Sequence, residues 1–475
     1  MRTPLPFLVN GRWYDSKESI GIVNPYTREE IAAISLATPE DIERAIESAQ
    51  NAFPQARVLP SHRRAEILTN IAEGIRQQRR EFAEIITQEA GKPIRFSLGE
   101  VDRAIQTFTL AAEEAKRLTG EVLPLDLQPG SENRWGLVRR FPVGVILGIT
   151  PFNFPLNLVA HKIAPALASG NCIILKPAPQ TPLTALKLGQ IIEKSGYIPG
   201  SVNIVPCSNR LAEKMVTDPR VKVVSFTGSA KVGWYLKQLA SDKKVMLELG
   251  GNAGMIVEQD VDWEYAAERA VLGGFAYAGQ VCIAVQRIYV IRSLFPAFCE
   301  KLVKQVEMMK TGNPMDPEVI MGPMISIEAA HQAEEWIQEA IQQGANLLCG
   351  GKRQKNYLQP TILTNTRPNM KVWSEEIFAP VMIVESFTEF EEALEMLDNS
   401  QYGLQAGVFV NEIKKIWQAF EKLEVGGVII NDYPTYRVDH MPYGGVKRSG
   451  FGREGIKYAI EEITEPKLLV INPLI

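Results

Sequence analysis

Short apolar runs alternate with amphipathic stretches between residues 143 and 249. The apolar runs and the helical patterns between them cover residues 143–149, 156–168, 172–175, 182–195, 202–205, 209–217, 221–226, 230–240 and 244–249. This alternation predicts β-α-β units wound into a parallel α/β sheet. Ligands of doubly wound sheets bind beyond the carboxyl ends of the strands. Functional residues are therefore expected in the loops that follow the apolar runs.

The segments on either side of this region carry other helical and strand patterns. Three- and four-residue spacing of apolar side chains predicts helices over residues 38–54, 61–90 and 96–118. The first portion of the chain is therefore expected to be helical packing material. Renewed alternation after Gly250-Gly251-Asn252 predicts a second α/β unit to about residue 450.

Two segments have the pattern of exposed strands. Residues 121–141 contain two alternating runs joined around Pro129-Gly130, which predicts a hairpin. The sequence K-L-L-V-I-N near the end of the chain predicts one more strand. Uncovered strands of this kind favour association between chains, so these segments make a homo-oligomer plausible.

The composition is that of an ordinary globular protein. Of 475 residues, 45% are apolar and 22% are charged, and the formal net charge is -4. These values exclude collagen-like and wholly disordered chains. The near balance of acidic and basic side chains supplies no field that would attract a phosphate backbone, so we expect no nucleic-acid partner.

Neither a membrane span nor a secretory segment is expected. The longest uncharged run, residues 141–160, contains Pro142, Pro151 and Pro155, which do not fit one continuous helix across a bilayer. The N-terminus lacks a secretory apolar region, and the five cysteines are scattered with no C-x-x-C pair. These features favour the reducing cytoplasm.

Two residues in loop settings are candidates for chemistry. Cys282 lies in A-G-Q-V-C-I-A between a helical pattern and a strand pattern, a setting that suits a nucleophile, although an inert thiol is the alternative. Glu248 ends the apolar run K-V-M-L-E, where a general-base role is reasonable and a surface carboxylate is the alternative.

Two glycine-containing segments can be compared as phosphate sites. The segment F-T-G-S-A-K-V-G at residues 226–233 follows a strand pattern and precedes a helical one, so its backbone N–H groups can face an anion. An ordinary strand-to-helix turn is the alternative. The string G-F-G-R-E-G at residues 450–455 matches the dinucleotide pattern by letter, but a turn-rich basic loop precedes it, so we do not expect a phosphate site there.

Several other chemistries lack their motifs. The sequence contains neither G-x-S-x-G nor H-E-x-x-H, and no Cys/His spacing is typical of zinc ligands. Serine hydrolase and zinc chemistry are therefore disfavoured, and no metal site is predicted. A cofactor-independent cysteine hydrolase built on Cys282 lacks a histidine nearby in the sequence.

Seven motifs, in order along essentially the whole chain, resemble those of the NAD(P)-dependent aldehyde dehydrogenase superfamily. They are P-F-N-F-P (151–155), L-K-P (175–177), F-T-G-S (226–229), E-L-G-G-N (248–252), G-Q-V-C (279–282), E-E-I-F-A-P (375–380) and P-Y-G-G-V-K-R-S-G-F-G-R-E (442–454). The resemblance implies an aldehyde dehydrogenase fold of the α/β class. Its expected parts are a Rossmann-like doubly wound cofactor domain (1–120 and 142–249), an α/β catalytic domain (250–450) and a small β oligomerisation element (121–141 and 459–475).

The resemblance also implies a reaction and the residues that carry it. Cys282, as a thiolate, attacks the aldehyde carbon, and a thiohemiacetal and then a thioester follow. The amide of Asn153 and the backbone N–H of Cys282 form the oxyanion hole, and Glu248 activates the water that hydrolyses the thioester. Lys162 and Glu454 match positions that assist proton movement and site organisation. Glu248 favours release of a free acid over transfer to coenzyme A.

For the cofactor, the resemblance implies a set of contacts along the dinucleotide. Lys176 is expected near the adenosine ribose, Gly228 and Ser229 at the pyrophosphate, and Glu376 at the nicotinamide ribose. The remaining contacts implied are Ile149, Thr150, Pro151, Phe152, Leu249 and Phe378. Two positions depart from the family pattern, Ala379 in place of a glycine and Pro179 in place of the glutamate common in NAD-selective members. Without that carboxylate, NADP should be tolerated or preferred over NAD.

For the substrate, family positions place Arg103, Phe154, Leu158, His161, Ile283 and Tyr443 at the pocket or its entrance. Arg103 suits an anionic group on the aldehyde, such as a carboxylate, phosphonate or sulfonate. A surface ion pair for Arg103 and a packing role for His161 are the alternatives.

These expectations combine into one predicted function. The chain should oxidise a small polar or anionic aldehyde, of lactaldehyde or semialdehyde type, to the acid with NAD(P), as a homodimer or homotetramer. A non-phosphorylating glyceraldehyde-3-phosphate or succinate-semialdehyde dehydrogenase is the alternative within the enzyme class. A catalytically silent structural homologue is the alternative outside it.

Overall fold

Parallel strands from the five apolar runs form the centre of the first large sheet in the computed structural model, which describes residues 3–472. The sheet has the order β2 (Arg12–Tyr14), β1 (Phe7–Val9), β9 (Val202–Ile204), β8 (Cys172–Lys176), β7 (Val145–Ile149), β10 (Val221–Thr227), β11 (Lys244–Glu248) and β23 (Gly450–Phe451). Nearly all side chains of the five central strands are buried, as expected when helices cover both faces. The predicted doubly wound α/β sheet is confirmed.

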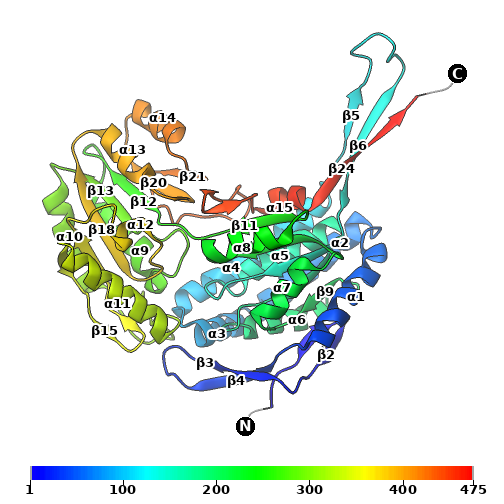
Figure 1. Cartoon of the computed structure of the whole chain (residues 1–475), viewed down its shortest axis with the longest axis horizontal. Helices are drawn as coiled ribbons and strands as arrows, with labels where there is room; N and C mark the ends of the chain where they lie inside the picture. The colour runs from blue at the N-terminus through cyan, green and yellow to red at the C-terminus, as the bar shows by residue number, and fades with distance from the viewer. Residues whose placement is uncertain (1–2, 473–475) are drawn as a thin grey trace.

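Helices pack on both faces of this sheet (Figure 1). One face carries α1 (Pro39–Ala56), α7 (Asn209–Thr217) and α8 (Ala230–Ala240), and the other carries α2 (Ser61–Gln77), α3 (Arg79–Ala90), α4 (Ile94–Ala115), α5 (Asn157–Ser169) and α6 (Leu183–Glu193). The stretch predicted as one helix over residues 61–90 is two helices, because the backbone leaves helical geometry at Gln78.

The N-terminal segment contains strands as well as helices, which the expectation of helical packing material missed. β1 and β2 join through Asn10-Gly11, both with positive φ, and β3 (Ser19–Val23) pairs with β4 (Glu30–Ser35). An Asn-Gly pair is a strong hairpin signal, but the strands beside it are too short to show an alternating pattern.

A second α/β body follows the first along the chain (Figure 1). Its sheet has the order β14 (Asn346–Cys349), β17 (Thr361–Thr364), β18 (Val381–Phe387), β13 (Arg287–Ile291), β12 (Gly254–Val257), β20 (Gln405–Phe409) and β21 (Gly427–Ile430), and all these strands are parallel except β14. The helices packed on it are α9 (Trp263–Phe275), α10 (Phe295–Met308), α11 (Ile327–Gln342), α12 (Lys371–Ser374), α13 (Phe390–Asp398) and α14 (Ile413–Lys422).

The chain then returns to the first body. β23 pairs antiparallel with β11, and α15 (Ile456–Glu462) packs against α5. The glycine-rich string at residues 450–455 thus lies at the sheet edge, where Gly455 precedes the first residue of α15.

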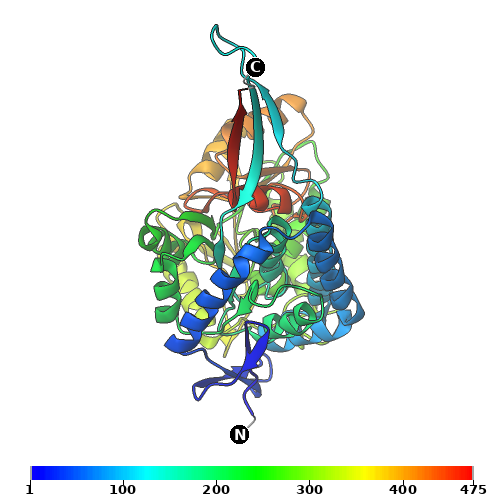
Figure 2. The same cartoon turned by 90° about the vertical axis from the view of Figure 1, so that its right-hand side faces the viewer.

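A three-stranded arm projects from the first body (Figures 1 and 2). It has the order β24 (Thr464–Ile471), β6 (Trp135–Pro142) and β5 (Glu121–Pro124), all antiparallel. The predicted hairpin and the predicted strand near the end of the chain are therefore confirmed as structure. Of the residues assigned to the expected domains, 1–2 and 473–475 lie outside the described part of the chain.

The uncharged run over residues 141–160 supplies the end of β6, all of β7 and the start of α5. Among the helices within residues 3–472, none is both long and apolar enough to cross a membrane.

Candidate active site

A cavity of about 770 Å³ lies among residues of both bodies, beyond the carboxyl ends of β7, β10 and β11. Many of the residues predicted for the site line it, from all three predicted groups. These are Arg103, Pro151, Phe152, Asn153, Phe154, Leu158, Gly228, Ser229, Glu248, Leu249, Cys282, Ile283, Glu376, Phe378 and Tyr443.

Other predicted residues lie outside this wall. Ile149 ends β7, the Thr150 N–H donates to the Lys176 carbonyl (3.2 Å), and Lys176 is buried at the end of β8. Pro179 is exposed just beyond that strand. Lys162 and Glu454 do not line the cavity, but they contact Thr227 and Arg437, which do. His161 does not line it either, and it contacts Asp439, the partner of Arg103.

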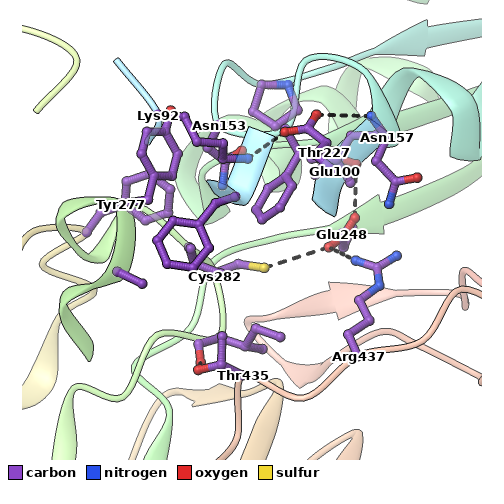
Figure 3. A pocket seen from close by; sticks show the side chains of 18 of the residues that line it. Lys92, Glu100, Asn153, Asn157, Thr227, Glu248, Tyr277, Cys282, Thr435 and Arg437 are labelled. Atoms are coloured by element: carbon purple, nitrogen blue, oxygen red, sulfur yellow. Dashed lines mark hydrogen bonds and ion pairs between the residues drawn. The ribbon is translucent and has the colours of Figure 1, made fainter. Parts of the chain in front are cut away.

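Cys282 is presented by an irregular segment that follows α9. Tyr277 and Ala278 have positive φ (54° and 56°), and this kink turns the chain toward the cavity. The sulfur lies 3.8 Å from Glu248 Oε1 (Figure 3) and 3.1 Å from Tyr443 Oη. Burial and then the Glu248 charge raise the pKa of the Cys282 thiol to about 12. The resting group is therefore a thiol with a carboxylate in position to accept its proton.

Glu248 ends β11 with both carboxylate oxygens engaged. Thr227 Oγ1 donates to Oε2 (3.2 Å), and Arg437 Nη1 lies 3.3 Å from Oε1 (Figure 3). Burial and the neighbouring charge of Glu454 raise the pKa of Glu248, while Arg437 opposes this effect. A carboxyl group with a raised pKa suits proton exchange near neutral pH.

A second carboxylate and two cations complete this buried cluster. Glu454 lies 3.0 Å from Arg437 Nη2 and 3.5 Å from Lys162 Nζ. Lys162 also donates to Thr227 Oγ1 (2.9 Å). Burial opposes ionisation of Glu454, but Lys162, His161 and Arg437 together lower its pKa below the usual range. Lys162, Glu454 and Arg437 therefore set the electrostatic environment of Glu248.

Sequence reasoning missed Arg437. Its only sequence signal is its place shortly before the P-Y-G-G motif, in a loop without helical or strand periodicity. It lines the cavity, and its guanidinium carbon lies 3.6 Å from the centroid of the Tyr443 ring.

Asn153 lies in the loop after β7 and faces the same cavity (Figure 3). Its Nδ2 donates to the Gln280 carbonyl (3.0 Å), and its buried Oδ1 forms no hydrogen bond within the described residues. An amide nitrogen has two hydrogens, so Nδ2 retains a second donor for an oxygen atom in the cavity.

The loop that carries Asn153 is held by a buried ion pair that sequence reasoning also missed. Glu100 Oε1 accepts the N–H groups of Leu156 (2.9 Å) and Asn157 (3.2 Å) at the start of α5, and its Oε2 lies 2.5 Å from Lys92 Nζ. Lys92 Nζ also lies 3.5 Å from the centroid of the Phe154 ring. These contacts fix α4, the Asn153 loop and α5 relative to one another.

Arg103 and His161 share one partner, Asp439. Arg103 lines the cavity and binds Asp439 through two hydrogen bonds of 2.7 and 3.1 Å. His161 Nε2 lies 2.8 Å from Asp439 Oδ1 and the ring is buried, so His161 positions Asp439 and does not line the cavity as predicted. Burial opposes ionisation of Asp439, but His161 and Arg103 lower its pKa.

Comparison with known proteins decides the family. Residues 13–469 match the model of the aldehyde dehydrogenase family. The chain belongs to the aldehyde dehydrogenase family. The predicted fold is therefore confirmed, and so is the predicted enzyme class, an NAD(P)-dependent aldehyde dehydrogenase.

Several relatives of this aldehyde dehydrogenase match it over nearly their whole length. The 3-sulfolactaldehyde dehydrogenase of Priestia aryabhattai is 45% identical, over 98% of this chain and 97% of its own. The lactaldehyde dehydrogenase of Methanococcus aeolicus is 40% identical, over 98% and 99%. Among solved structures, glyceraldehyde-3-phosphate dehydrogenase GapN from Methanocaldococcus jannaschii, complexed with NADP, is 41% identical, with a TM-score of 0.92 over 96% and 99% of the two chains.

The wall of the cavity has groups that fit NAD(P) at two places. Gly228 and Ser229 follow β10 and precede α8, whose N-terminal N–H groups suit a pyrophosphate. The Glu376 carboxylate accepts one hydrogen bond, from the Gly251 N–H (3.2 Å), which leaves acceptor capacity for ribose hydroxyls. Burial raises the pKa of Glu376 to about 8. Phe152 and Phe378 pack edge to face beside this position, with ring centroids 5.9 Å apart.

Proposed function

We propose that this enzyme oxidises a small aldehyde with an anionic or hydroxylated tail to the free carboxylic acid, with Cys282 as nucleophile and Glu248 as general base. One observation carries the proposal: Cys282, Glu248, Asn153 and Arg103 all face one cavity. Cys282, Glu248 and Asn153 carry out the proposed reaction. Arg103 provides a cation that can bind the tail of the aldehyde.

The chemistry of Cys282 and Asn153 follows from the distances. The thiol proton moves to Glu248, whose Oε1 is 3.8 Å from the sulfur, and the sulfur then adds to the aldehyde carbon. The aldehyde oxygen becomes anionic, and the second N–H of Asn153 Nδ2 binds it. NAD(P), when bound, supplies the hydride acceptor for the oxidation, which leaves a thioester on Cys282.

Glu248 releases the thiol proton through the cavity to solvent, which restores its carboxylate, and it then acts on water. It accepts a proton from the water that attacks the thioester carbon, and the Cys282 thiolate leaves as the carboxylic acid forms. A free acid, and not a coenzyme A ester, is the expected product because this carboxylate is present. Lys162 and Glu454 are proposed to organise the charge around it.

The choice of an anionic tail rests on the cations at the cavity. Arg95 and Arg103 lie on the same side of α4, two helical turns apart, and both line the cavity. Within the described residues Arg95 has no ion-pair partner, and Arg103 is fixed in orientation by Asp439. The relative named above as 3-sulfolactaldehyde dehydrogenase acts on an aldehyde with an anionic sulfonate, which supports this choice. The relative named as lactaldehyde dehydrogenase acts on an aldehyde with a hydroxyl group, the other kind of tail proposed.

A second candidate substrate is glyceraldehyde 3-phosphate. It is favoured by the similarity to GapN, whose name states that activity. Succinate semialdehyde is a third, because aldehyde dehydrogenase 21 of Physcomitrella patens, solved with succinate, is 41% identical with a TM-score of 0.97 over 99% and 98% of the two chains.

A substrate panel tests the proposal. We expect Arg103→Ala to raise KM for lactaldehyde, succinate semialdehyde or glyceraldehyde 3-phosphate by roughly tenfold or more, since a charge-assisted hydrogen bond is lost. The KM for propanal, which has no polar tail, should change far less. Equal effects on all of these aldehydes would remove the proposed role of Arg103. Each substrate is assayed with both NAD and NADP.

We further propose that NADP is accepted, because position 179, near Lys176, has no carboxylate that would repel a 2′-phosphate.

A homodimer or homotetramer is proposed from the arm, where Leu468, Leu469 and Val470 of β24 are exposed. Light scattering of the purified protein tests this assembly.

A cytoplasmic location is proposed from the cysteines, all five of which are free thiols.

A further inference from the structure

Tyr443 stands out among the residues that line the cavity because its hydroxyl reaches the sulfur of Cys282. The two atoms are 3.1 Å apart, within hydrogen-bond distance for sulfur. Tyr443 is only 2% exposed, so its side chain is almost entirely removed from bulk water. The role implied for Tyr443 by family position was a place in the substrate pocket, which does not account for the contact with sulfur.

The backbone fixes Tyr443 in this place. Its N–H donates to the carbonyl of Glu454 (3.0 Å), and the Glu454 N–H donates back to the Tyr443 carbonyl. The Arg437 guanidinium lies over the ring, 3.6 Å from its centroid. The ring is thus held between a backbone bridge and a cation, and its hydroxyl position is set without contribution from a substrate.

The donor and acceptor in this contact can be assigned. Cys282 has one thiol hydrogen, and Glu248 in its ionised form, 3.8 Å from the sulfur, can only accept it. The sulfur therefore accepts the remaining hydrogen bond, and Tyr443 donates. Burial raises the pKa of Tyr443 well above its usual value, so the phenol keeps its hydrogen throughout the physiological pH range.

We propose that Tyr443 is a further catalytic residue, which donates a hydrogen bond to Cys282 Sγ and stabilises the thiolate. The proposal rests on the proposed role of Cys282 as nucleophile. When the thiol proton moves to Glu248, the sulfur becomes anionic, and the bond from Tyr443 becomes charge-assisted and stronger. When sulfur bonds to the aldehyde carbon, its negative charge passes to the aldehyde oxygen and the bond from Tyr443 weakens. Tyr443 itself gains and loses no proton.

The size of the effect follows from two opposing consequences. A hydrogen bond that lowers the thiol pKa by one unit raises the thiolate fraction about tenfold at a pH below that pKa. A less basic thiolate is also a weaker nucleophile, by roughly threefold per pKa unit for attack on disulfides. At a pH below the thiol pKa, such as pH 8, a decrease of one unit in that pKa therefore increases the reaction rate of Cys282 about threefold. Where the thiol is fully ionised, the same decrease lowers the rate.

The test measures the reaction of Cys282 with dithiodipyridine as a function of pH, in the whole enzyme without cofactor or aldehyde. The same measurement on Cys282→Ala gives the background from the other cysteines. We expect Tyr443→Phe to react about threefold more slowly at pH 8 and to have a rate profile displaced to higher pH. The ring and its packing are retained, so the displacement reports on the hydroxyl.

Tyr289→Phe is the matched control. Tyr289 is fully buried, its hydroxyl donates to the Met396 carbonyl (3.1 Å), and it does not line the cavity. Its profile should coincide with that of the unaltered enzyme. A Tyr443→Phe profile that coincides with it too, or an equal displacement in both variants, would overturn the proposal.

If the Tyr443→Phe protein does not fold, a second variant tests the proposal. Incorporation of 3-fluorotyrosine at position 443 keeps the hydroxyl and makes it more acidic, hence a better donor. The profile should then move to lower pH, and an unmoved profile contradicts the proposal. Failure of the proposed function looks different: Cys282→Ala would keep its aldehyde turnover, whatever the profiles of the Tyr443 variants.

Discussion

Arg437 Nη1 lies 3.3 Å from Glu248 Oε1, so the proposed general base is paired with a buried cation. The same guanidinium lies 3.0 Å from Glu454. Both carboxylates are buried, and Arg437 offsets the repulsion between them. Arg437 therefore counteracts the effects of burial and of Glu454, which raise the pKa of Glu248.

Replacing Arg437 should move the pH dependence of thioester hydrolysis upward. A base works only when ionised, so activity rises with pH through the pKa of Glu248, which lies above the usual glutamate range. Arg437→Gln should raise this pKa further and reduce the hydrolysis rate at neutral pH about tenfold per unit of displacement. Arg437→Lys, which keeps the charge, should move the profile less. Stopped-flow measurement of acid release between pH 6 and 10 checks this, and coincident profiles would contradict it.

Removal of the Glu248 carboxylate should trap the thioester. In Glu248→Gln, at most one equivalent of reduced cofactor per active site should appear, more slowly than in the unaltered enzyme because Cys282 has lost its proton acceptor, and steady turnover should fall roughly 10²–10⁴-fold. Intact-protein mass spectrometry should detect the acyl group, and its absence in Glu248→Gln/Cys282→Ser is the control. Unchanged steady turnover would show that another group activates the water.

Removing only the Glu100 charge of the Lys92–Glu100 pair should destabilise the protein more than removing both charges. Lys92 is 1% exposed, so Glu100→Gln leaves a buried ammonium without its carboxylate, at a cost of roughly 3–5 kcal/mol. The double variant Lys92→Met/Glu100→Gln, which removes the charge as well, should recover part of this loss. Thermal unfolding of the two variants beside Lys92→Met alone measures the effect, and equal melting temperatures for all would contradict it.

A carboxylate at position 179 should discriminate against NADP. Pro179 is exposed, near Lys176 at the end of β8, so Pro179→Glu should raise KM for NADP severalfold and leave KM for NAD nearly unchanged. The effect should shrink as salt is added, because exposed charges are screened. Pro179→Gln, which has the size without the charge, is the control. An equal rise with NAD and NADP would indicate a change of shape and not of charge.

The parts of the fold that could be predicted are those with local patterns. The central strands β7 to β11 are buried on both faces, so they appear in the sequence as apolar runs. Of the strands in the N-terminal segment, β1 and β2 were missed because they have three residues each, too few to establish a period. Their turn, Asn10-Gly11, was the one available signal.

Site residues could be predicted where a sequence motif marks them, but not where they are paired with residues far away in the sequence. Cys282 and Glu248 lie in recognisable segments, but the ion pairs of Arg437 and Asp439 join residues separated by up to 336 positions. Asp439 explains why His161 could not be placed correctly: the sequence shows a histidine on a helix but not the carboxylate it faces. Lys92 and Glu100 are close in sequence, yet nothing in helical spacing shows that both are buried.

The return of the chain to the first body after the second has an effect on biosynthesis. Arg437, Tyr443 and Glu454 lie on segments that are made well after Glu248 and Cys282. A nascent chain thus contains the sulfur of Cys282 before the groups that modulate it have been made. The complete site can form only after these later segments have been made, and a product truncated before them would carry the nucleophile without its surroundings.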